Sequence, residues 1–137
     1  MKTKLAHVCI ESTDLQLTED FYALLGLQRR FEFRNQDDEL VGFYLAFENQ
    51  TYIEVILVAE LKSEGAVKHF AVEADDLDAT YEAMKNAGVE VTEKKLEGDN
   101  TLMITCNDPS GVYIEIQSYT DESMQLHGGE CPVNYKP

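Results

Sequence analysis

Apolar and polar residues alternate in two short segments of the chain. Leu5–Ile10 has the sequence LAHVCI, and Val67–Val72 has the sequence VKHFAV. A period of two is typical of a β-strand with one buried face. Both segments are therefore predicted strands, and each of them contains a histidine, His7 in the first and His69 in the second.

A helix is predicted directly after each of these strands. Thr13 or Asp14 can cap the first helix, and the second is expected to begin near Asp75 or Asp76. Apolar residues recur at helical spacing in both segments: Leu17, Phe21, Leu24 and Leu25 in the first, and Leu77, Tyr81 and Met84 in the second. Each helical pattern ends at a glycine, which favours the left-handed conformation of a helix C-cap.

Three more predicted strands follow each helix, so the pattern of the chain is βαβββ, repeated once. In order they are Gln28–Phe33, Val41–Glu48, Thr51–Val58, Val89–Lys95, Leu102–Asn107 and Val112–Ser118. We expect one α+β domain, residues 1–137, with a module at 4–58, a linker at 59–65, a second module at 66–119 and an irregular tail at 120–137. The two modules are expected to form a curved mixed sheet around a cleft.

The spacing of individual residues indicates that the two modules are copies of one unit. An offset of 62 residues separates His7 from His69, Asp14 from Asp76, Leu15 from Leu77 and Gly26 from Gly88. The offset between Glu54 and Glu115 is 61, which the loss of one residue between them explains. Because a constant offset over so much of each copy is hard to produce by chance, we infer a tandem duplication.

One carboxylate lies at the centre of the fourth predicted strand of each module. Glu54 lies in TYIEVI and Glu115 in VYIEIQ. If the two sheets face a common cleft, these glutamates converge with His7 and His69. A single strand glutamate usually faces solvent and a single histidine is usually a hydrogen-bonded core residue, but their recurrence in register favours a shared site. Two imidazoles and two carboxylates suit a divalent ion, which would offset the two negative charges.

The chain is strongly acidic, and this narrows the partners that we expect. Its formal net charge is −15 and its pI is near 4.4, which argues against nucleic acid and anionic membrane surfaces. No apolar run approaches the ~18 residues of a membrane helix, and the N-terminus does not resemble a signal peptide. Three cysteines at no metal-like spacing favour reduced thiols in a cytoplasm. Cys9 is interpreted as a small buried thiol rather than a ligand or nucleophile.

Several segments together resemble the vicinal oxygen chelate superfamily of glyoxalases, bleomycin-resistance proteins and extradiol dioxygenases. They are HVCIESTDLQLTEDFYALLGL, KHFAVEADDLDATYEAMKNAGVEV and NDPSGVYIEI, and the similarity covers about residues 4–119. The order His, Glu, His, Glu resembles bacterial glyoxalase I. This resemblance implies that His7, Glu54, His69 and Glu115 bind one divalent metal ion per site. Ni²⁺ or Zn²⁺ is favoured, and Co²⁺, Fe²⁺ and Mn²⁺ stay open.

The resemblance also implies a reaction of lyase or isomerase type. In a glyoxalase I-like enzyme the metal ion chelates two neighbouring substrate oxygens and stabilises an enediolate as it forms. A carboxylate removes the proton alpha to a carbonyl and returns it to the adjacent carbon. The resemblance makes Glu115 the expected base and Glu54 its symmetry partner, acting on a small α-hydroxy or α-keto carbonyl compound.

Two positions depart from the glyoxalase I pattern and bear on the substrate. Glu11 stands where glyoxalase I has an arginine that helps to hold glutathione, and Val58 stands where it has an asparagine. An acidic side chain at residue 11 would repel a glutathione carboxylate. A lyase that acts on another α-hydroxy or α-keto compound therefore fits the sequence at least as well as a lactoylglutathione lyase.

Other functions within the superfamily stay open. An extradiol dioxygenase would use Fe²⁺ with two histidines and one carboxylate, and a fourth ligand at Glu54 crowds that arrangement. A methylmalonyl-CoA epimerase-like isomerase needs the same proton chemistry, but the sequence has no basic patch for the CoA phosphates. A non-catalytic small-molecule binder of the bleomycin-resistance kind would not need four intact ligands. Because a short linker favours pairing of modules across two chains, we expect a homodimer with two shared sites.

Overall fold

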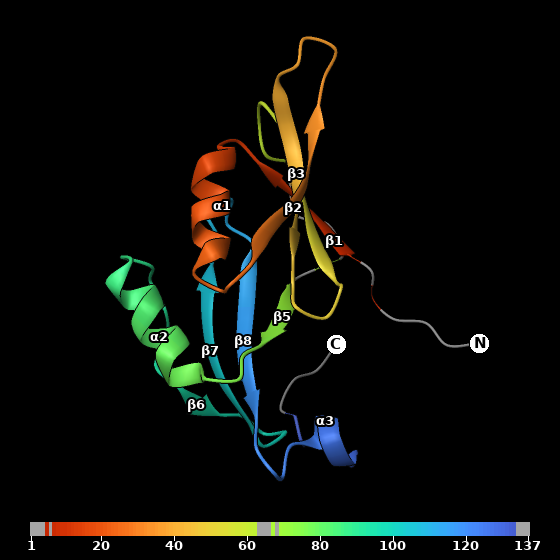
Figure 1. The fold of residues 1–137 in the computed structure, drawn as a ribbon. Helices are drawn as coiled ribbons and strands as arrows, with labels where there is room; N and C mark the ends of the chain where they lie inside the picture. Colours follow the sequence, from red (N-terminus) through yellow and green to blue (C-terminus); the bar gives the residue numbers. More distant parts are fainter. Residues whose placement is uncertain (1–4, 6, 63–66, 68, 134–137) are drawn as a thin grey trace, which may run out of the picture. The chain divides into compact units, whose positions relative to one another are not determined.

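The structure of the chain is a computed structural model that describes residues 5, 7–62, 67 and 69–133. The chain divides into two compact units, Met1–Val67 with Asp108–Val112 (unit 1) and Lys68–Asn107 with Tyr113–Pro137 (unit 2). Each unit contains one four-stranded mixed sheet and one longer helix (Figure 1). The α+β class and the repeated βαβββ order predicted from the sequence are confirmed.

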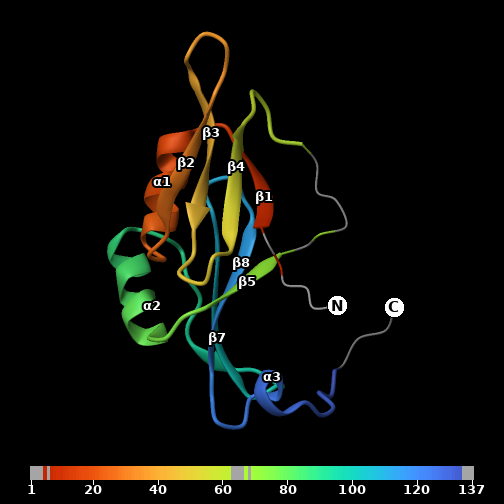
Figure 2. The same cartoon turned by 45° about the vertical axis from the view of Figure 1, so that its right-hand side comes forward.

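Unit 1 follows the predicted order of one strand, one helix and three strands. Its elements are β1 (His7–Ser12), α1 (Leu15–Ala23), β2 (Gln28–Arg34), β3 (Leu40–Ala46) and β4 (Tyr52–Leu57). The order of strands in the sheet is β1-β4-β3-β2, with β1 parallel to β4 and the other neighbours antiparallel (Figure 2). The first strand therefore lies beside the last one, and its side chains meet those of β4.

Alternate residues of β3 and β4 form the core of unit 1. Phe43, Leu45, Ile53 and Val55 are at most 1% exposed, and Tyr22 of α1 is fully buried as well. Burial of each such apolar side chain stabilises the fold by roughly 1.5–3 kcal/mol. Because strand side chains alternate between faces, the residues between them point away from this core, and Glu54 is one of these.

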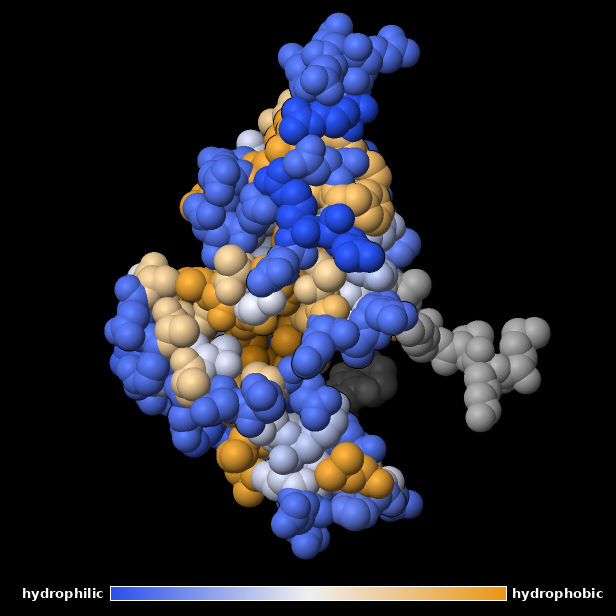
Figure 3. Space-filling view, in the orientation of Figure 1, coloured by the Kyte–Doolittle hydropathy of each residue, from blue (hydrophilic) through white to orange (hydrophobic). Residues whose placement is uncertain are grey.

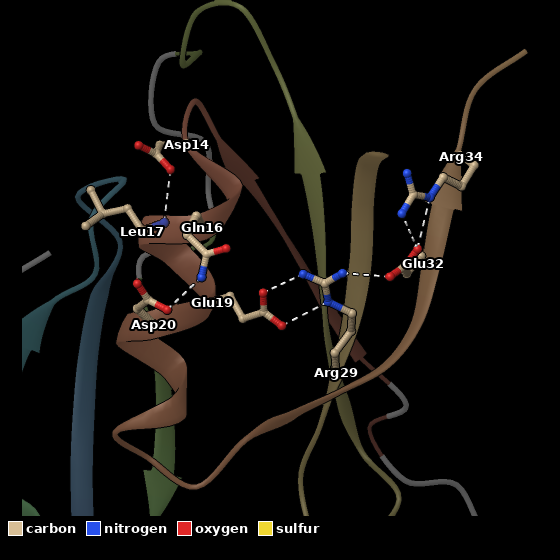
Figure 4. Close-up of polar contacts among 8 residues, drawn as sticks. All are labelled: Asp14, Gln16, Leu17, Glu19, Asp20, Arg29, Glu32 and Arg34. Atoms are coloured by element: carbon tan, nitrogen blue, oxygen red, sulfur yellow. Dashed lines mark hydrogen bonds and ion pairs between the residues drawn. The ribbon is translucent and has the colours of Figure 1, made fainter. Parts of the chain in front are cut away.

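Polar contacts fix α1 at its start and along its outer side. The Asp14 carboxylate accepts a hydrogen bond from the Leu17 N–H at 3.0 Å, so Asp14 is the N-cap. Such a cap stabilises a helix by about 1 kcal/mol. The guanidinium of Arg29 in β2 donates two hydrogen bonds to the Glu19 carboxylate of α1 (Figure 4). The edge strand is thereby tied to the helix.

The tip of the β2–β3 hairpin is hydrophilic throughout. Its residues are Asn35, Gln36, Asp37, Asp38 and Glu39, and they form the blue projection at the top of Figure 3. The Asn35 side-chain oxygen accepts hydrogen bonds from the N–H groups of Asp37 and Glu39 at 3.0 and 2.9 Å. The turn chemistry expected of Asn and Asp residues is therefore present.

Unit 2 repeats the order of elements and adds a short final helix. Its elements are β5 (Phe70–Glu73), α2 (Leu77–Asn86), β6 (Lys95–Leu96), β7 (Thr101–Asn107), β8 (Tyr113–Tyr119) and α3 (Met124–His127). The strand order is β5-β8-β7-β6, with β5 parallel to β8. Asp76 caps α2 by accepting the Ala79 N–H at 2.9 Å. Gly26 and Gly88 have φ values of 80° and 81° after their helices, as the predicted left-handed caps require.

The core of unit 2 uses the equivalent positions. Ile104 of β7, Ile114 and Ile116 of β8, and Met84 of α2 are all fully buried. Glu115 lies between two of these isoleucines, so its side chain points to the opposite face of the sheet. In both units the buried layer therefore sets the direction of the central glutamate.

The predicted strand Val89–Lys95 is wrong over most of its length. Only a single bridge, between Val91 and Cys106, precedes the two-residue strand β6. At this point the Thr105 N–H donates to the hydroxyl of Thr92 at 2.8 Å, and of the two possible backbone bonds the one from the Thr92 N–H to the Thr105 carbonyl, at 3.0 Å, is present. A side-chain oxygen that takes a backbone donor interrupts the ladder of strand hydrogen bonds.

The expectation of a wholly irregular tail is also wrong, because the tail contains α3. Ser123, just before this helix, is fully buried, and its hydroxyl donates to the Asn100 carbonyl at 2.9 Å. Gln125 donates to the Asp99 carboxylate at 2.6 Å and accepts from the Thr101 hydroxyl at 2.9 Å. These partners precede the helix by more than twenty residues, so no local pattern predicts the docking of the tail.

Residues 63–65 of the predicted linker and 134–137 of the predicted tail lie outside the described residues. The arrangement of both sheets around one shared cleft stays a prediction. No helix in the described part of the chain is long and apolar enough to span a membrane.

Candidate metal centre

The face of each sheet that lies opposite its helix is called the open face here. In unit 1 it carries His7 and Glu54, because β1 and β4 pair in parallel with His7 opposite Tyr52 and Cys9 opposite Glu54. The His7 Nε2 atom lies 3.2 Å from the Glu54 Oε2 atom. Their side chains are 40% and 23% exposed, so both remain within reach of a small ligand.

Unit 2 places its own histidine and glutamate in the same relation. His69 immediately precedes β5, and Glu115 lies at the centre of β8, paired with Ala71 of β5. The His69 Nε2 atom lies 3.5 Å from the Glu115 Oε2 atom, and the side chains are 42% and 20% exposed. The duplication has therefore preserved a contact as well as a pattern of residues.

The separations of the two pairs suit two ligands of one metal ion. Imidazole nitrogen and carboxylate oxygen bind zinc at about 2.0–2.2 Å. Two such atoms lie roughly 3.0 Å apart at a right angle and roughly 3.4 Å apart at the tetrahedral angle. The observed 3.2 and 3.5 Å are close to these values. Mixed nitrogen and oxygen donors also match the preference of borderline divalent ions, so each pair fits half of a four-ligand site.

The structure brings the four predicted ligands together as two pairs, one in each unit. Among the described residues, no group of three or more His, Cys, Asp and Glu side chains could hold a metal ion. One pair supplies two ligands, and a site with four protein ligands needs both pairs. The convergence of His7 and Glu54 with His69 and Glu115 on one ion stays a prediction, within one chain or across two copies.

Tyr44 of β3 is a further residue of the unit 1 site that the sequence reasoning missed. It lies directly opposite Glu54 in the antiparallel register. Its hydroxyl donates to Glu54 Oε2 at 3.2 Å and lies 3.4 Å from His7 Nδ1. Desolvation and the hydrogen bond to Glu54 raise the pKa of Tyr44, which keeps the phenol protonated and able to donate. Alternation along Phe43, Tyr44 and Leu45 already places this side chain on the face of Glu54.

Tyr44 belongs to a group of ring contacts on the open face of unit 1, called the aromatic cluster here: Phe31, Phe33, Tyr44 and Tyr52. Phe31 stacks on Tyr44 with centroids 4.3 Å apart and an interplanar angle of 27°. Phe33 meets Tyr44 edge to face at 5.8 Å. Phe31 is 46% exposed. An aromatic surface therefore lies directly beside the histidine and glutamate of unit 1.

Gly42 makes room for this cluster. A β-carbon at residue 42 would lie 2.8 Å from Cδ2 of Phe33 and would also collide with the Val55 carbonyl oxygen. Side-chain carbon atoms do not approach each other so closely without a shift of the structure. The glycine therefore lets the Phe33 ring lie close over the strand.

The open face of unit 2 has different surroundings. Thr105 stands opposite Glu115, where unit 1 has Tyr44 opposite Glu54. The donor to Glu115 is instead Gln117, whose amide reaches Oε2 at 3.2 Å from the same strand. Tyr113 meets the His69 ring edge-on at 5.8 Å. The two pairs are equivalent, but the residues around them are not.

Glu11 and Cys9 lie on the same strand as His7, β1. The Glu11 carboxylate accepts the backbone N–H of Lys62 at 2.9 Å, and the Lys62 ammonium lies 4.0 Å away. Glu11, which stands where glyoxalase I has a glutathione-binding arginine, is thus partly paired with Lys62. Cys9 was expected to be buried, but it is exposed. Partial desolvation and the carboxylates of Glu54 and Glu11 raise the pKa of its thiol.

Comparison with known proteins agrees with the fold. A family model described as Glyoxalase/Bleomycin resistance protein/Dioxygenase superfamily matches residues 4–116. The chain is 26% identical over 134 residues to a "Probable lactoylglutathione lyase" of Vibrio parahaemolyticus, covering 91% of this chain and 97% of that protein. The fosfomycin resistance protein FosX of Listeria monocytogenes has a TM-score of 0.68 at 18% identity, with coverage of 89% and 98%. A glyoxalase family protein of Enterococcus faecalis has a TM-score of 0.69 at 15% identity, with coverage of 83% and 96%.

Proposed function

The chain belongs to the glyoxalase/bleomycin resistance protein/dioxygenase superfamily, and from this premise we propose that it is a metal-dependent lyase or isomerase of glyoxalase I type. The resemblance stated from the sequence is thereby confirmed at the level of the superfamily. The observation that carries the proposal is the contact between a histidine and a glutamate at equivalent places in both units, at 3.2 and 3.5 Å. The likeness to the Vibrio protein supports the same reaction class.

In this proposal His7, Glu54, His69 and Glu115 together hold one divalent ion per site. Ni²⁺ and Zn²⁺ are favoured, and Co²⁺, Fe²⁺ and Mn²⁺ are also compatible with these donors. When bound, such an ion acts as a Lewis acid that stabilises negative charge developing on the substrate oxygens. The side chains of both pairs are partly exposed, which leaves them accessible to a substrate.

The protein's own residues supply the proton transfer. We assign Glu115 as the base that takes a proton from the carbon alpha to a carbonyl and returns it to the neighbouring carbon. The substrate is isomerised without net oxidation or reduction, so no co-reactant is consumed. Gln117 donates a hydrogen bond to Glu115 Oε2 at 3.2 Å and orients that carboxylate. Glu54 is the symmetry partner of the base and acts as a ligand.

The surroundings of the unit 1 pair bear on the substrate class. The aromatic cluster beside His7 and Glu54 favours a small α-hydroxy or α-keto carbonyl compound with an apolar or aromatic substituent. Glu11 stands where an arginine would assist a glutathione carboxylate, and its contact with Lys62 offsets only part of that charge. A thiol carrier other than glutathione, or none, is therefore compatible with the site.

The experiment that tests the proposal is metal analysis followed by an activity assay. Elemental analysis of the purified protein should find about one divalent ion per four-ligand site. The metal-free protein, restored with each of the five ions in turn, is then assayed with the hemithioacetals that methylglyoxal and phenylglyoxal form with glutathione and with a neutral thiol. Isomerisation of any of these substrates supports the proposal. A protein that is indifferent to metal would favour a non-catalytic binder, and ring cleavage of a catechol with Fe²⁺ would favour a dioxygenase.

We also propose a homodimer in which each site takes ligands from both copies. The short linker between the modules supports this, because it favours pairing of modules across two copies, and one pair alone supplies only two of the four ligands. Light scattering in dilute solution is expected to give twice the mass of the chain. A monomer that still binds one metal ion through four protein ligands would contradict sharing between copies.

A further inference from the structure

We infer that Tyr44 is a positioning residue that holds the His7–Glu54 pair in the orientation that a metal ion requires. This inference rests on the proposed metal site, but it concerns a residue outside the four predicted ligands. It follows from contacts within unit 1 alone.

The Tyr44 hydroxyl makes contact with both members of the pair. It donates to Glu54 Oε2 at 3.2 Å, and its oxygen lies 3.4 Å from His7 Nδ1. Since one hydroxyl has one hydrogen, donation to Glu54 leaves the oxygen free to accept from an Nδ1–H group of His7. The tyrosine therefore offers an acceptor to the histidine tautomer that carries its proton on Nδ1, the form that leaves Nε2 free to bind a metal ion.

That tautomer has a consequence for the other ring nitrogen. Its lone pair is on Nε2, the atom that lies 3.2 Å from Glu54 Oε2. Two acceptor atoms then face each other, and a cation between them offsets their repulsion. One phenol thus fixes the free lone pair of the histidine and the rotamer of the carboxylate together, as partners of metal ligands commonly do.

The aromatic cluster keeps the phenol itself in place. Phe31 stacks on the Tyr44 ring at 4.3 Å, Phe33 meets it edge-on at 5.8 Å, and Tyr52 lies at 5.6 Å. The ring therefore has neighbours on a face and on its edges, which restricts its rotation before any ligand binds. A positioning residue needs this support, because a mobile donor cannot orient its acceptor.

Unit 2 provides an internal comparison. Thr105 takes the place of Tyr44 opposite Glu115, and its side chain is much shorter. Gln117 donates to Glu115, so the carboxylate of unit 2 has a donor of its own. In unit 1, by contrast, one phenol contacts both the histidine and the glutamate. Loss of the Tyr44 hydroxyl should therefore weaken one half of the metal site specifically.

The test compares Tyr44→Phe with Tyr81→Phe in the full-length protein. Tyr44→Phe keeps the ring and its stacking but removes the hydroxyl. Tyr81→Phe is the matched control, because it removes a tyrosine-to-glutamate hydrogen bond, of 2.8 Å to Glu93, in unit 2. The metal-free proteins are titrated with Co²⁺, whose visible absorption reports both affinity and coordination geometry. Circular dichroism and the melting temperature check the fold of each variant.

We expect Tyr44→Phe to bind Co²⁺ about 10- to 100-fold more weakly, with an altered visible spectrum. Tyr81→Phe should retain the affinity and spectrum of the wild type. Wild-type affinity and spectrum in a folded Tyr44→Phe protein would overturn the inference. If the wild-type protein binds Co²⁺ but isomerises none of the substrates, the proposed reaction is overturned. The Co²⁺ titrations of the two variants would still decide whether Tyr44 positions the ligands. No uptake of Co²⁺ by the wild type would overturn both.

Discussion

Unit 1 and unit 2 share a fold and a histidine–glutamate pair, but they differ in what surrounds that pair. The side chains of His7 and Glu54 are 40% and 23% exposed, and those of His69 and Glu115 are 42% and 20% exposed. This agreement persists although the aromatic cluster lies beside the unit 1 pair, while Thr105, Tyr113 and Gln117 lie beside the unit 2 pair. The position of the ligands therefore depends on strand register and the buried core, while their neighbours are free to diverge.

The divergence is concentrated on the third strand of each unit. Gly42 and Tyr44 of β3 correspond to Met103 and Thr105 of β7, at the same offset of 61 that separates the two glutamates. The glycine admits the Phe33 ring, and the tyrosine reaches the ligands. A duplicated fold can thus acquire two different ligand environments through a few substitutions that leave both cores intact.

Among the substitutions that test the difference between the two units, the largest expected effect is on turnover, at the two glutamates. Glu115→Gln, assayed with the metal site fully loaded, should lower kcat by about 10²- to 10⁴-fold, because an amide cannot take up the substrate proton. Glu54→Gln should weaken metal binding with a smaller loss of kcat at full metal occupancy, since Glu54 is assigned as a ligand only, whereas Glu115 is assigned as both ligand and base. Steady-state kinetics and metal analysis of both variants check this. Equal losses of kcat at full metal occupancy would show that the two glutamates share one role.

A second substitution replaces Gly42 of β3, whose counterpart in β7 is Met103. Gly42→Ala should lower the free energy of unfolding by about 1–3 kcal/mol, because its β-carbon would collide with the Val55 carbonyl oxygen and meet Phe33 at 2.8 Å. Urea denaturation measures the loss. Gly98→Ala is the control, since its β-carbon would meet the Cys131 sulfur at 3.3 Å and the Pro132 carbonyl oxygen at 3.7 Å, both milder contacts. A loss no larger than that of the control would show that neither the Val55 backbone nor the Phe33 ring requires a glycine at residue 42.

A third change concerns the substituent that the aromatic cluster is proposed to favour. Phe31→Ala should raise KM for a phenylglyoxal-derived substrate by roughly 2- to 10-fold, from the loss of an aromatic contact of about 0.5–1.5 kcal/mol. The methylglyoxal-derived substrate should be affected less. Leu96→Ala, at an exposed apolar residue on the edge strand of unit 2, is the control. An equal effect on both substrates would argue against a substrate contact at Phe31.

The smallest effect is expected at the thiol beside the unit 1 pair. Cys9→Ser should leave Co²⁺ affinity within about twofold of the wild type, as exposed substitutions outside a binding site usually do. A raised pKa also keeps this thiol protonated near neutral pH, which disfavours it as a ligand. A clear loss of Co²⁺ affinity, or the loss of a sulfur-to-cobalt absorption band, would show that Cys9 is a ligand. The ligand environments of the two units would then differ further.

Local patterns were sufficient for most of the fold. Asp14 and Asp76 cap the starts of the two longer helices, and Gly26 and Gly88 follow their ends. These features were predictable because caps depend on residues a few positions apart. The predictions that failed involve hydrogen-bond partners that are distant in sequence, or side-chain groups that take the place of a backbone acceptor. The Thr92 hydroxyl takes the Thr105 N–H where the predicted second strand of unit 2 would pair with β7, and only the two-residue β6 forms. The tail helix docks through residues around Asp99.

For the candidate site, the sequence by itself determined which residues recur and on which strand face they lie. Duplication and alternation are properties of spacing, so His7, Glu54, His69 and Glu115 could be named without coordinates. Only the tertiary structure decided that each histidine meets its own glutamate at 3.2 and 3.5 Å, and that Tyr44 joins the first pair. The reason is that parallel pairing of β1 with β4 and of β5 with β8 joins segments more than forty residues apart. Spacing along the chain carries no information about such distances between side chains.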